Sequence, residues 1–188
     1  MRKPNFRNVL VALGLAAITA QAAPGITGMG AGFKLSFVAA DHFGPGFGFG
    51  GHYLLNIGLD RAGTIAIYPN PEFWFASHHN DYRYPADLRY YDVNIFELDF
   101  NMDARYYFPL PPNIPVGPYV GMGMAPVVEI LSWENDIIDN NTDVGAAFNL
   151  LTGMDFPMGA IKGFVEMRGK LGSGYDAFKL SFGITFPF

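Results

Sequence analysis

The amino-acid sequence predicts an all-β protein, an eight-stranded antiparallel up-and-down barrel. Three observations predict this class. Residues 178–188 carry a large apolar side chain at every even position and Lys, Ser, Gly, Thr or Pro at every odd one. A period of two is that of a strand with one apolar and one polar face. Seven earlier segments repeat the pattern, and the 23 glycines and 18 phenylalanines suit strands and tight turns better than helices.

The first half of the chain holds four of the expected strands, at about residues 33–38, 47–59, 64–75 and 96–108. A short loop and a tight turn connect the first three strands, at 41–46 and 60–63. Gly63 stands where such a turn needs a positive φ. We expect a long polar loop over 77–89, because this stretch has no alternation.

The third strand contains an irregularity. Pro69 and Pro71 both lack a backbone N–H, and a closed sheet has no free edge on which a missing donor could be hidden. We therefore expect a bulge or a break around Asn70.

The second half holds the other four strands, at about 118–130, 148–156, 161–171 and 178–188. The Pro-rich stretch 109–115 cannot continue a hydrogen-bonded ladder and must be a turn. The remaining connections are an acidic loop, a short turn and a Gly-rich turn, at 134–143, 157–160 and 172–176.

The first 22 residues have the composition of a cleavable signal peptide. Basic residues, an apolar stretch and small residues follow one another as Arg2, Lys3 and Arg7, then 9–20, then Ala20-Gln21-Ala22. The apolar stretch is about half the roughly 20 residues that a membrane-spanning helix requires. We expect cleavage after Ala22, which leaves one barrel domain at 23–188.

Composition excludes several classes of protein. The chain has no cysteine, so it has neither disulfides nor thiolate metal sites, which suits an exported protein. Its formal net charge is −5, and removal of a basic leader makes the mature chain more acidic still. An acidic chain argues against a nucleic-acid partner. A length of 188 residues provides for a single domain.

The charged residues decide which face of the strands points outwards. The apolar faces carry none, and the polar faces carry Lys34, Glu72, Glu97, Asp99, Asp103, Arg105, Glu129, Asp155, Lys162, Glu166, Arg168, Lys170 and Lys179. The apolar faces hold Phe, Leu, Ile and Met, which are too bulky for the lumen of eight strands, whereas Gly and Ala on the polar faces make room inside. We therefore predict a barrel whose apolar exterior faces lipid and whose loops alternate between short and long.

Two internal motifs and the last residue support the prediction of a membrane barrel. The stretches Asp103-Ala104-Arg105-Tyr106-Tyr107-Phe108-Pro109 and Pro118-Tyr119-Val120-Gly121-Met122-Gly123, together with the terminal Phe188, stand at the expected places. On these residues the mature chain resembles the small eight-stranded outer-membrane barrels of the OmpA-transmembrane, OmpX and OmpW type, often described as porin-family barrel domains.

The resemblance implies a location and partners. A member of this group would be a monomer in the bacterial outer membrane, with both termini in the periplasm. It would contact outer-membrane lipids and lipopolysaccharide, and periplasmic chaperones and the barrel-assembly machinery would deliver it. The resemblance assigns Phe186 and Phe188 to the assembly signal. It implies no particular activity.

The inward charges predict a structural ion-pair network. Its expected members are Glu72, Glu97, Asp99, Asp103, Arg105, Glu166, Arg168 and Lys170. Opposite charges in a narrow tube should pair, because an unpaired buried charge is strongly unfavourable. With the bulky Tyr68, Trp74 and Phe164 beside them, we expect these side chains to occlude the lumen.

The sequence therefore favours a non-enzymatic outer-membrane protein with a structural or surface-interaction role. The sequence leaves two alternatives open: an OmpW-like conduit for small hydrophobic molecules, and a lipid A-modifying enzyme. The lipid A deacylase barrels carry His-x-Ser on a strand, whereas this chain has His52-Tyr53-Leu54.

Two further segments contain residue types that can bind a metal ion. His78-His79 is better explained as part of a solvated loop than as a metal site. The stretch 139–145 departs from an EF-hand because its glycine comes one place late and Leu150 replaces the final acid. Loose bridging of a divalent cation to lipopolysaccharide remains open there. We predict no catalytic, cofactor-binding or metal-binding residue.

Overall fold

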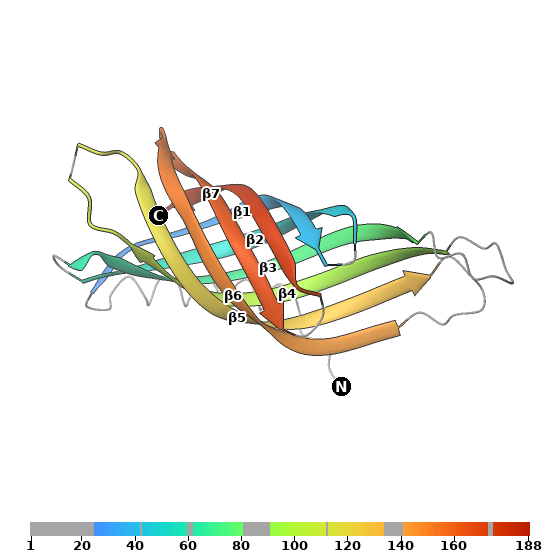
Figure 1. The fold of residues 1–188 in the computed structure, drawn as a ribbon. Helices are drawn as coiled ribbons and strands as arrows, with labels where there is room; N and C mark the ends of the chain where they lie inside the picture. The colour runs from blue at the N-terminus through green and yellow to red at the C-terminus, as the bar shows by residue number, and fades with distance from the viewer. Residues whose placement is uncertain are drawn as a thin grey trace, which may run out of the picture.

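The chain forms a single closed barrel of eight antiparallel strands (Figure 1). A computed structural model describes residues 25–41, 43–59, 62–80, 91–111, 113–133, 141–172 and 175–188. The strands are β1 (Ile26–Ala40), β2 (Pro45–Gly58), β3 (Thr64–Asn80), β4 (Tyr91–Tyr107), β5 (Gly117–Trp133), β6 (Asn141–Met158), β7 (Ile161–Gly172) and β8 (Ala177–Pro187). The predicted all-β, up-and-down barrel is confirmed. The predicted signal peptide lies outside the described residues.

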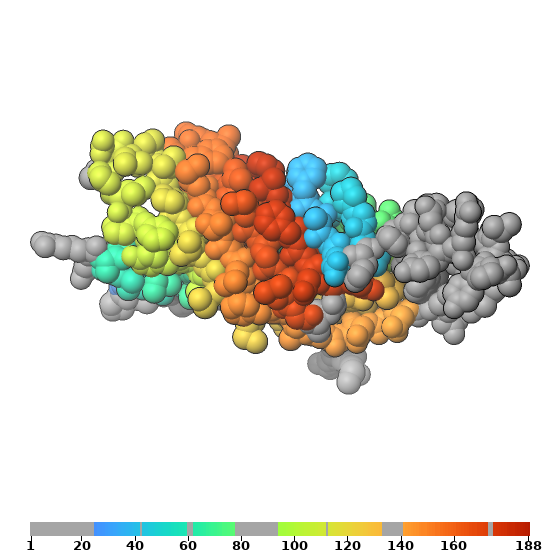
Figure 2. Space-filling view, viewed as in Figure 1, coloured from blue at the N-terminus to red at the C-terminus, as the bar shows by residue number. Residues whose placement is uncertain are grey.

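Each strand pairs with its neighbours in sequence, and β8 closes the barrel against β1. Eleven residue pairs hold this seam in register, from Gly30↔Pro187 to Ala40↔Ala177. Figure 2 shows the red strand β8 directly beside the blue strand β1. The amide N–H of Phe188 donates to the carbonyl of Met29 at 3.0 Å, so the last residue also joins the seam.

The two ends of the barrel differ. We call the end that carries the connections after β1, β3, β5 and β7 the loop end, and the other the turn end, where β1 starts and β8 finishes. Strands β3, β4, β5 and β6 have 17 or 18 residues, whereas β7 and β8 have 12 and 11. The four longer strands therefore project beyond the others at the loop end (Figure 1).

The prediction of a bulge or break around Asn70 is confirmed in part: the ladder between β2 and β3 is interrupted there, whereas β3 itself has no bulge and continues unbroken. The β3–β4 register runs without a shift from Thr64↔Tyr107 to Asn80↔Tyr91. On the other side, the β2–β3 ladder is interrupted between its pairs Gly50↔Glu72 and Leu55↔Ile67, without a change of register. Alternate residues of a strand direct their N–H groups to the same neighbour. Pro69 and Pro71 therefore both omit a donor towards β2, and the ladder to β4 stays intact.

Two segments that were expected to be loops belong to strands. Residues 77–80 extend β3, so His78 and His79 lie in a strand rather than in a solvated loop. Residues 141–147 begin β6, so most of the stretch 139–145 is extended chain. The physical reason is pairing: both segments continue regular ladders with β4 and β5, and these ladders compensate for their weak apolar alternation.

The exterior is apolar, as predicted. Exposed large side chains cover every strand, among them Phe33, Leu35, Phe49, Phe75, Phe100, Met124, Leu150, Met167 and Phe182. Among outward strand positions with described side chains, none is charged. The described part of the chain contains no helix long and apolar enough to span a membrane.

A glycine at the seam leads to a stability prediction. A Cβ placed on Gly32 would lie 1.8 Å from the carbonyl oxygen of Ile184 and 2.7 Å from Cε1 of His52. A Cβ on Gly169, on the outer face of β7, would meet nothing within 4 Å. We expect Gly32→Ala to lower the free energy of unfolding by about 1–3 kcal/mol through overpacking.

The measurement is a urea titration of the refolded barrel, read by the folded band on an unheated gel. Gly169→Ala is the matched control and should unfold at the wild-type midpoint. Equal midpoints for both variants would contradict the close approach of β1 and β8 at Gly32.

Candidate functional site

The lumen contains a network of paired charges, which we call the lumen network. It joins five carboxylates, Glu72, Glu97, Asp99, Asp103 and Glu166, to five basic side chains, Lys34, Arg105, Arg168, Lys170 and Lys179. Each of these ten residues is at most 2% exposed. They point inwards because strand alternation places them opposite the outward apolar residues. Equal numbers of opposite charges leave the network formally neutral.

The larger branch of the network alternates acids and bases along the lumen. Its order is Lys34, Glu72, Lys179, Asp99, Lys170 and Glu97. Lys179 Nζ lies 3.3 Å from Glu72 Oε2 and 2.5 Å from Asp99 Oδ2. Trp74 Nε1 donates to Glu97 Oε1 at 2.7 Å. Ser36 Oγ donates to the other oxygen of Glu72 at 2.5 Å, which satisfies both carboxylate oxygens of that residue.

The smaller branch lies nearer the turn end and links Arg105, Glu166, Arg168 and Asp103. Arg105 Nη2 lies 2.5 Å from Glu166 Oε2, and Arg168 Nη2 lies 2.9 Å from Glu166 Oε1. The same Nη2 atom lies 2.7 Å from Asp103 Oδ2. Two arginines therefore share one glutamate, and the second arginine also reaches an aspartate on β4.

Asn70 joins the two branches. Its Oδ1 accepts from Lys34 Nζ at 2.9 Å and from Arg168 Nη2 at 3.2 Å, while its Nδ2 donates to Asp103 Oδ2 at 2.8 Å. The residue is fully buried between Pro69 and Pro71. Asn70, where the sequence predicted a bulge or break, is thus the residue that connects the two branches of the network.

The charges are separated between two walls of the barrel. Four acids lie on β3 and β4, and four bases lie on β7, β8 and β1. In an eight-stranded barrel β4 stands opposite β8, so most ion pairs cross the bore. Arg105 on β4 and Glu166 on β7 reverse this arrangement, and they pair with each other.

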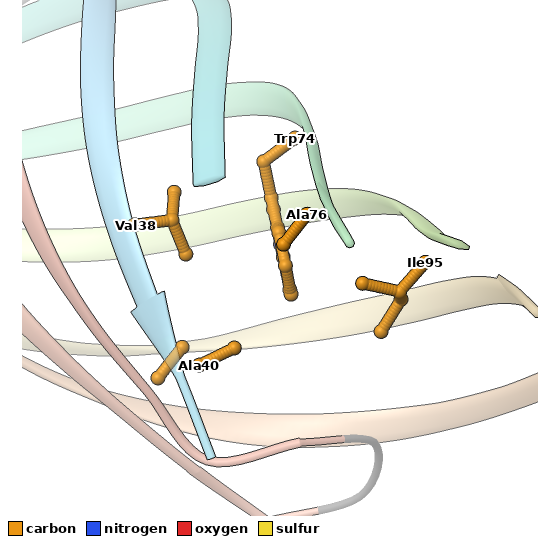
Figure 3. Close-up of a cluster of buried hydrophobic side chains, with 6 residues drawn as sticks. Val38, Ala40, Trp74, Ala76 and Ile95 are labelled. Atoms are coloured by element: carbon orange, nitrogen blue, oxygen red, sulfur yellow. The ribbon is translucent and has the colours of Figure 1, made fainter. Parts of the chain in front are cut away.

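An apolar cluster covers the network at the loop end. It consists of Val38, Ala40, Trp74, Ala76, Ile95 and Ala177, with Phe43, Leu131 and Tyr175 packed against it. Figure 3 shows the labelled members of this cluster inside the barrel. In the β7–β8 connection, the ring of Tyr175 lies edge-on to Phe43 with centroids 4.7 Å apart. Burial, and secondarily the Glu129 carboxylate, raises the pKa of the Tyr175 phenol.

Aromatic side chains cover the network at the turn end. The guanidinium of Arg105 lies 3.3 Å from the ring centroid of Tyr68 and 4.4 Å from that of Tyr119. Such stacking stabilises a cation that has left water. Tyr68 also packs with Leu54 and Ala66 in a small buried cluster. Charges in the middle of the lumen are therefore enclosed by apolar groups on both sides.

His52 is the one inward histidine with a described side chain, and it does not form a hydrolytic triad. Its Nε2 lies 2.8 Å from Thr185 Oγ1, but its Nδ1 has no hydrogen-bond partner among the described residues. A triad requires an acid at Nδ1 to orient the imidazole. The ring instead packs 5.2 Å from Tyr68 and 5.3 Å from Phe164, as part of the lumen filling.

All eight predicted network residues lie in the lumen, and every one of them takes part in an ion pair. The prediction omitted Lys34, Lys179 and Asn70. For the two lysines a signal existed, because alternation placed both on the inner face. For Asn70 the flanking prolines obscured this signal, because they predicted an irregular strand. Within the described ranges, no three His, Asp or Glu side chains are arranged to hold a metal ion.

Comparison with known proteins gives the fold a context. No protein-family model matches the sequence, and no curated protein matches it. Among solved structures, the chain is similar to the N-terminal β-barrel domain of Pseudomonas aeruginosa OprF, with 14% identity and a TM-score of 0.50 over 85% of this chain and 97% of that one. It is similar to Neisserial surface protein A, with 14% identity and a TM-score of 0.51 over 86% and 96%.

A third similar structure is Ail, the attachment invasion locus protein of Yersinia pestis, in complex with the heparin analogue sucrose octasulfate. It has 12% identity and a TM-score of 0.52, over 86% of this chain and 97% of that one. All three are eight-stranded outer-membrane barrels. At these identities the likeness shows the fold alone, and the chain has the fold of the small outer-membrane barrels.

Arg168 provides a test of the network. Its replacement by Ala leaves Asp103 without its arginine partner and Glu166 with only Arg105. Removing one partner of a buried ion pair is strongly destabilising, by about 3–5 kcal/mol. We expect Arg168→Ala to lower the urea midpoint accordingly.

The matched control is Lys162→Ala, which removes an exposed base from the same strand. Its free energy of unfolding should stay within about 0.5 kcal/mol of wild type. If Arg168→Ala were equally stable, the ion pairs would not hold the two walls together.

Proposed function

We propose, from the shared fold of the small outer-membrane barrels, that this chain is a non-enzymatic outer-membrane protein with an occluded lumen and a structural or surface-interaction role. The observation that supports it best is the lumen network, because ten buried charges pair with one another inside the bore, where a channel would need space. Eight strands enclose only enough room for side chains. Function would then reside on the ends and outer face of the barrel.

The proposed orientation places both termini and the short turns in the periplasm. Outer-membrane barrels have short periplasmic turns and longer external loops. The turn at residues 159–160 and the four longer strands at the opposite end support this assignment. The loop end would then stand outside the cell, where it meets lipopolysaccharide and any surface partner.

We propose that periplasmic chaperones and the barrel-assembly machinery deliver the chain to the outer membrane. The assembled barrel would be a monomer. Phe186 and Phe188 would form the recognised C-terminal signal. In the folded barrel both remain exposed, at 45% and 55%, and their rings lie 6.1 Å from those of Phe33 and Tyr53 respectively. This exposure leaves them available on the lipid-facing side of the seam.

The alternatives have less support. A conduit for hydrophobic molecules would need an apolar lumen, whereas the middle of this one carries ten charges. A lipid A-modifying enzyme would need an activated nucleophile, and no acid among the described residues orients His52 beside Thr185.

Conductance in a planar lipid bilayer tests the proposal. The refolded, mature protein should show current near the background at neutral pH, because the ion pairs and both apolar ends fill the bore. A porin added to the same bilayer confirms that insertion would be detected. Steady, large channels from the unmodified protein would contradict the proposal of an occluded lumen and would favour a conduit.

Deletion of Phe188 tests the assembly signal. We expect it to lower the amount of folded barrel in the outer membrane several-fold, because the machinery would lose its terminal aromatic residue. Phe178→Ala removes an equally exposed aromatic from the same strand face and serves as the control. Equal outer-membrane levels of both variants, measured by the heat-shifted band in isolated envelopes, would refute this role for Phe188.

A further inference from the structure

The turn end contains an open cleft that the lumen network does not use. Two adjoining hollows of about 290 and 280 Å³ share three lining residues, Tyr107, Asp155 and Lys162. We call their union the turn-end cleft. Leu54 lines its inner side, and this residue belongs to the buried cluster that covers the network. The cleft is therefore a pocket with a floor, and a ligand could occupy it without entering the bore.

Asp155 is the acid with unused hydrogen-bonding capacity in this cleft. Its Oδ2 accepts from Tyr107 OH at 3.0 Å, whereas its buried Oδ1 has no hydrogen-bond partner in the described chain. A buried oxygen without a donor is unfavourable. Asp155 lines both hollows, and the broad terminal torsion of an aspartate lets its carboxylate adjust to a ligand in the cleft.

Lys162 supplies the opposite charge to the same cleft. It stands on β7, next to β6, which carries Asp155, and its side chain is exposed. Neither Lys162 nor Asp155 takes part in the ion pairs of the lumen network. The cleft thus presents, on neighbouring strands, a carboxylate with one unpartnered oxygen and an ammonium group. The charges of Arg105 and Lys162 both act on this carboxylate.

The remaining lining separates into two parts. The first hollow contains side chains with hydroxyl and amide groups, Thr27, Asn56 and Thr64. The second contains apolar side chains, Ile114, Val116 and Phe156. Each hollow has a volume near the lower limit for small-molecule sites, about 300 Å³, which suits a ligand smaller than a drug.

We infer that the turn-end cleft binds small zwitterions of the amino-acid class with an apolar side chain. The ligand's ammonium group donates to Asp155, its carboxylate pairs with Lys162, and its side chain packs against Ile114 and Val116. Charge-assisted hydrogen bonds of this kind are the stronger ones in proteins. The site requires no passage through the lumen, so the conductance result leaves it unaffected.

Three related compounds separate the two charged contacts. L-leucine carries both groups, L-leucinamide lacks the carboxylate, and 4-methylpentanoate lacks the amine. Each is titrated into the refolded, isotope-labelled barrel in detergent micelles, and the backbone amide resonances of residues 155 and 162 are followed. We expect saturable shifts with leucine, and weaker binding of both analogues.

Each variant should weaken only the compounds that carry the charged group its residue contacts. Asp155→Asn should weaken leucine and leucinamide about tenfold while leaving 4-methylpentanoate unchanged, since a charged hydrogen bond becomes a neutral one. Lys162→Ala should weaken leucine and 4-methylpentanoate and spare leucinamide. Asparagine keeps the shape of aspartate and still accepts from Tyr107, so the barrel should stay folded.

The control is Glu129→Gln, which neutralises another buried carboxylate with an unpartnered oxygen, on β5 towards the loop end. It should bind leucine as wild type does. The inference fails if leucine gives no saturable shift in the wild-type barrel, or if Asp155→Asn binds leucine with unchanged affinity.

Discussion

The fold depends on one constraint: a backbone surrounded by an apolar exterior must find all its hydrogen-bond partners within the sheet. An unpaired group in lipid is unfavourable by several kcal/mol, so an open edge is not viable. The β1–β8 seam meets this demand with eleven residue pairs, extended by the bond from Phe188 to Met29. Closure over eight strands then sets the width of the bore, and every inward side chain has to fit within it.

The narrow bore explains why the charges are arranged on two walls. Acids on β3 and β4 face bases on β7, β8 and β1, so most of the pairs tie opposite sides of the barrel together. Buried ion pairs are often no more stabilising than well-packed apolar residues. Here an apolar interior would remove the difference between the two faces of each strand, and this difference specifies which face turns outwards. The network thereby contributes to the orientation of the strands.

The two ends of the lumen have different chemistry. At the loop end a cluster around Trp74 and Ile95 covers the charges, and at the turn end Tyr68 and Tyr119 enclose Arg105. Beyond Leu54 the interior opens into a cleft lined by Asp155 and Lys162, which take no part in the ion pairs of the lumen network. A barrel that is filled at its centre can therefore still interact with small molecules at its mouth and with larger partners at its loops.

The sequence by itself determined the class of fold, the number of strands and the face on which each charge lies, because a period of two is a local property of the chain. It could not decide how far β3 and β6 extend, since pairing with β4 and β5 maintains these strands where alternation is weak. Nor could it decide that Pro69 and Pro71 leave β3 unbroken, because that depends on which neighbour each N–H would face. The pairing of Lys179 with Glu72 and Asp99, and the place of Asn70 between two branches, arise only on closure. Closure brings Lys179 and Glu72 together inside the bore, although they lie 107 positions apart in the chain.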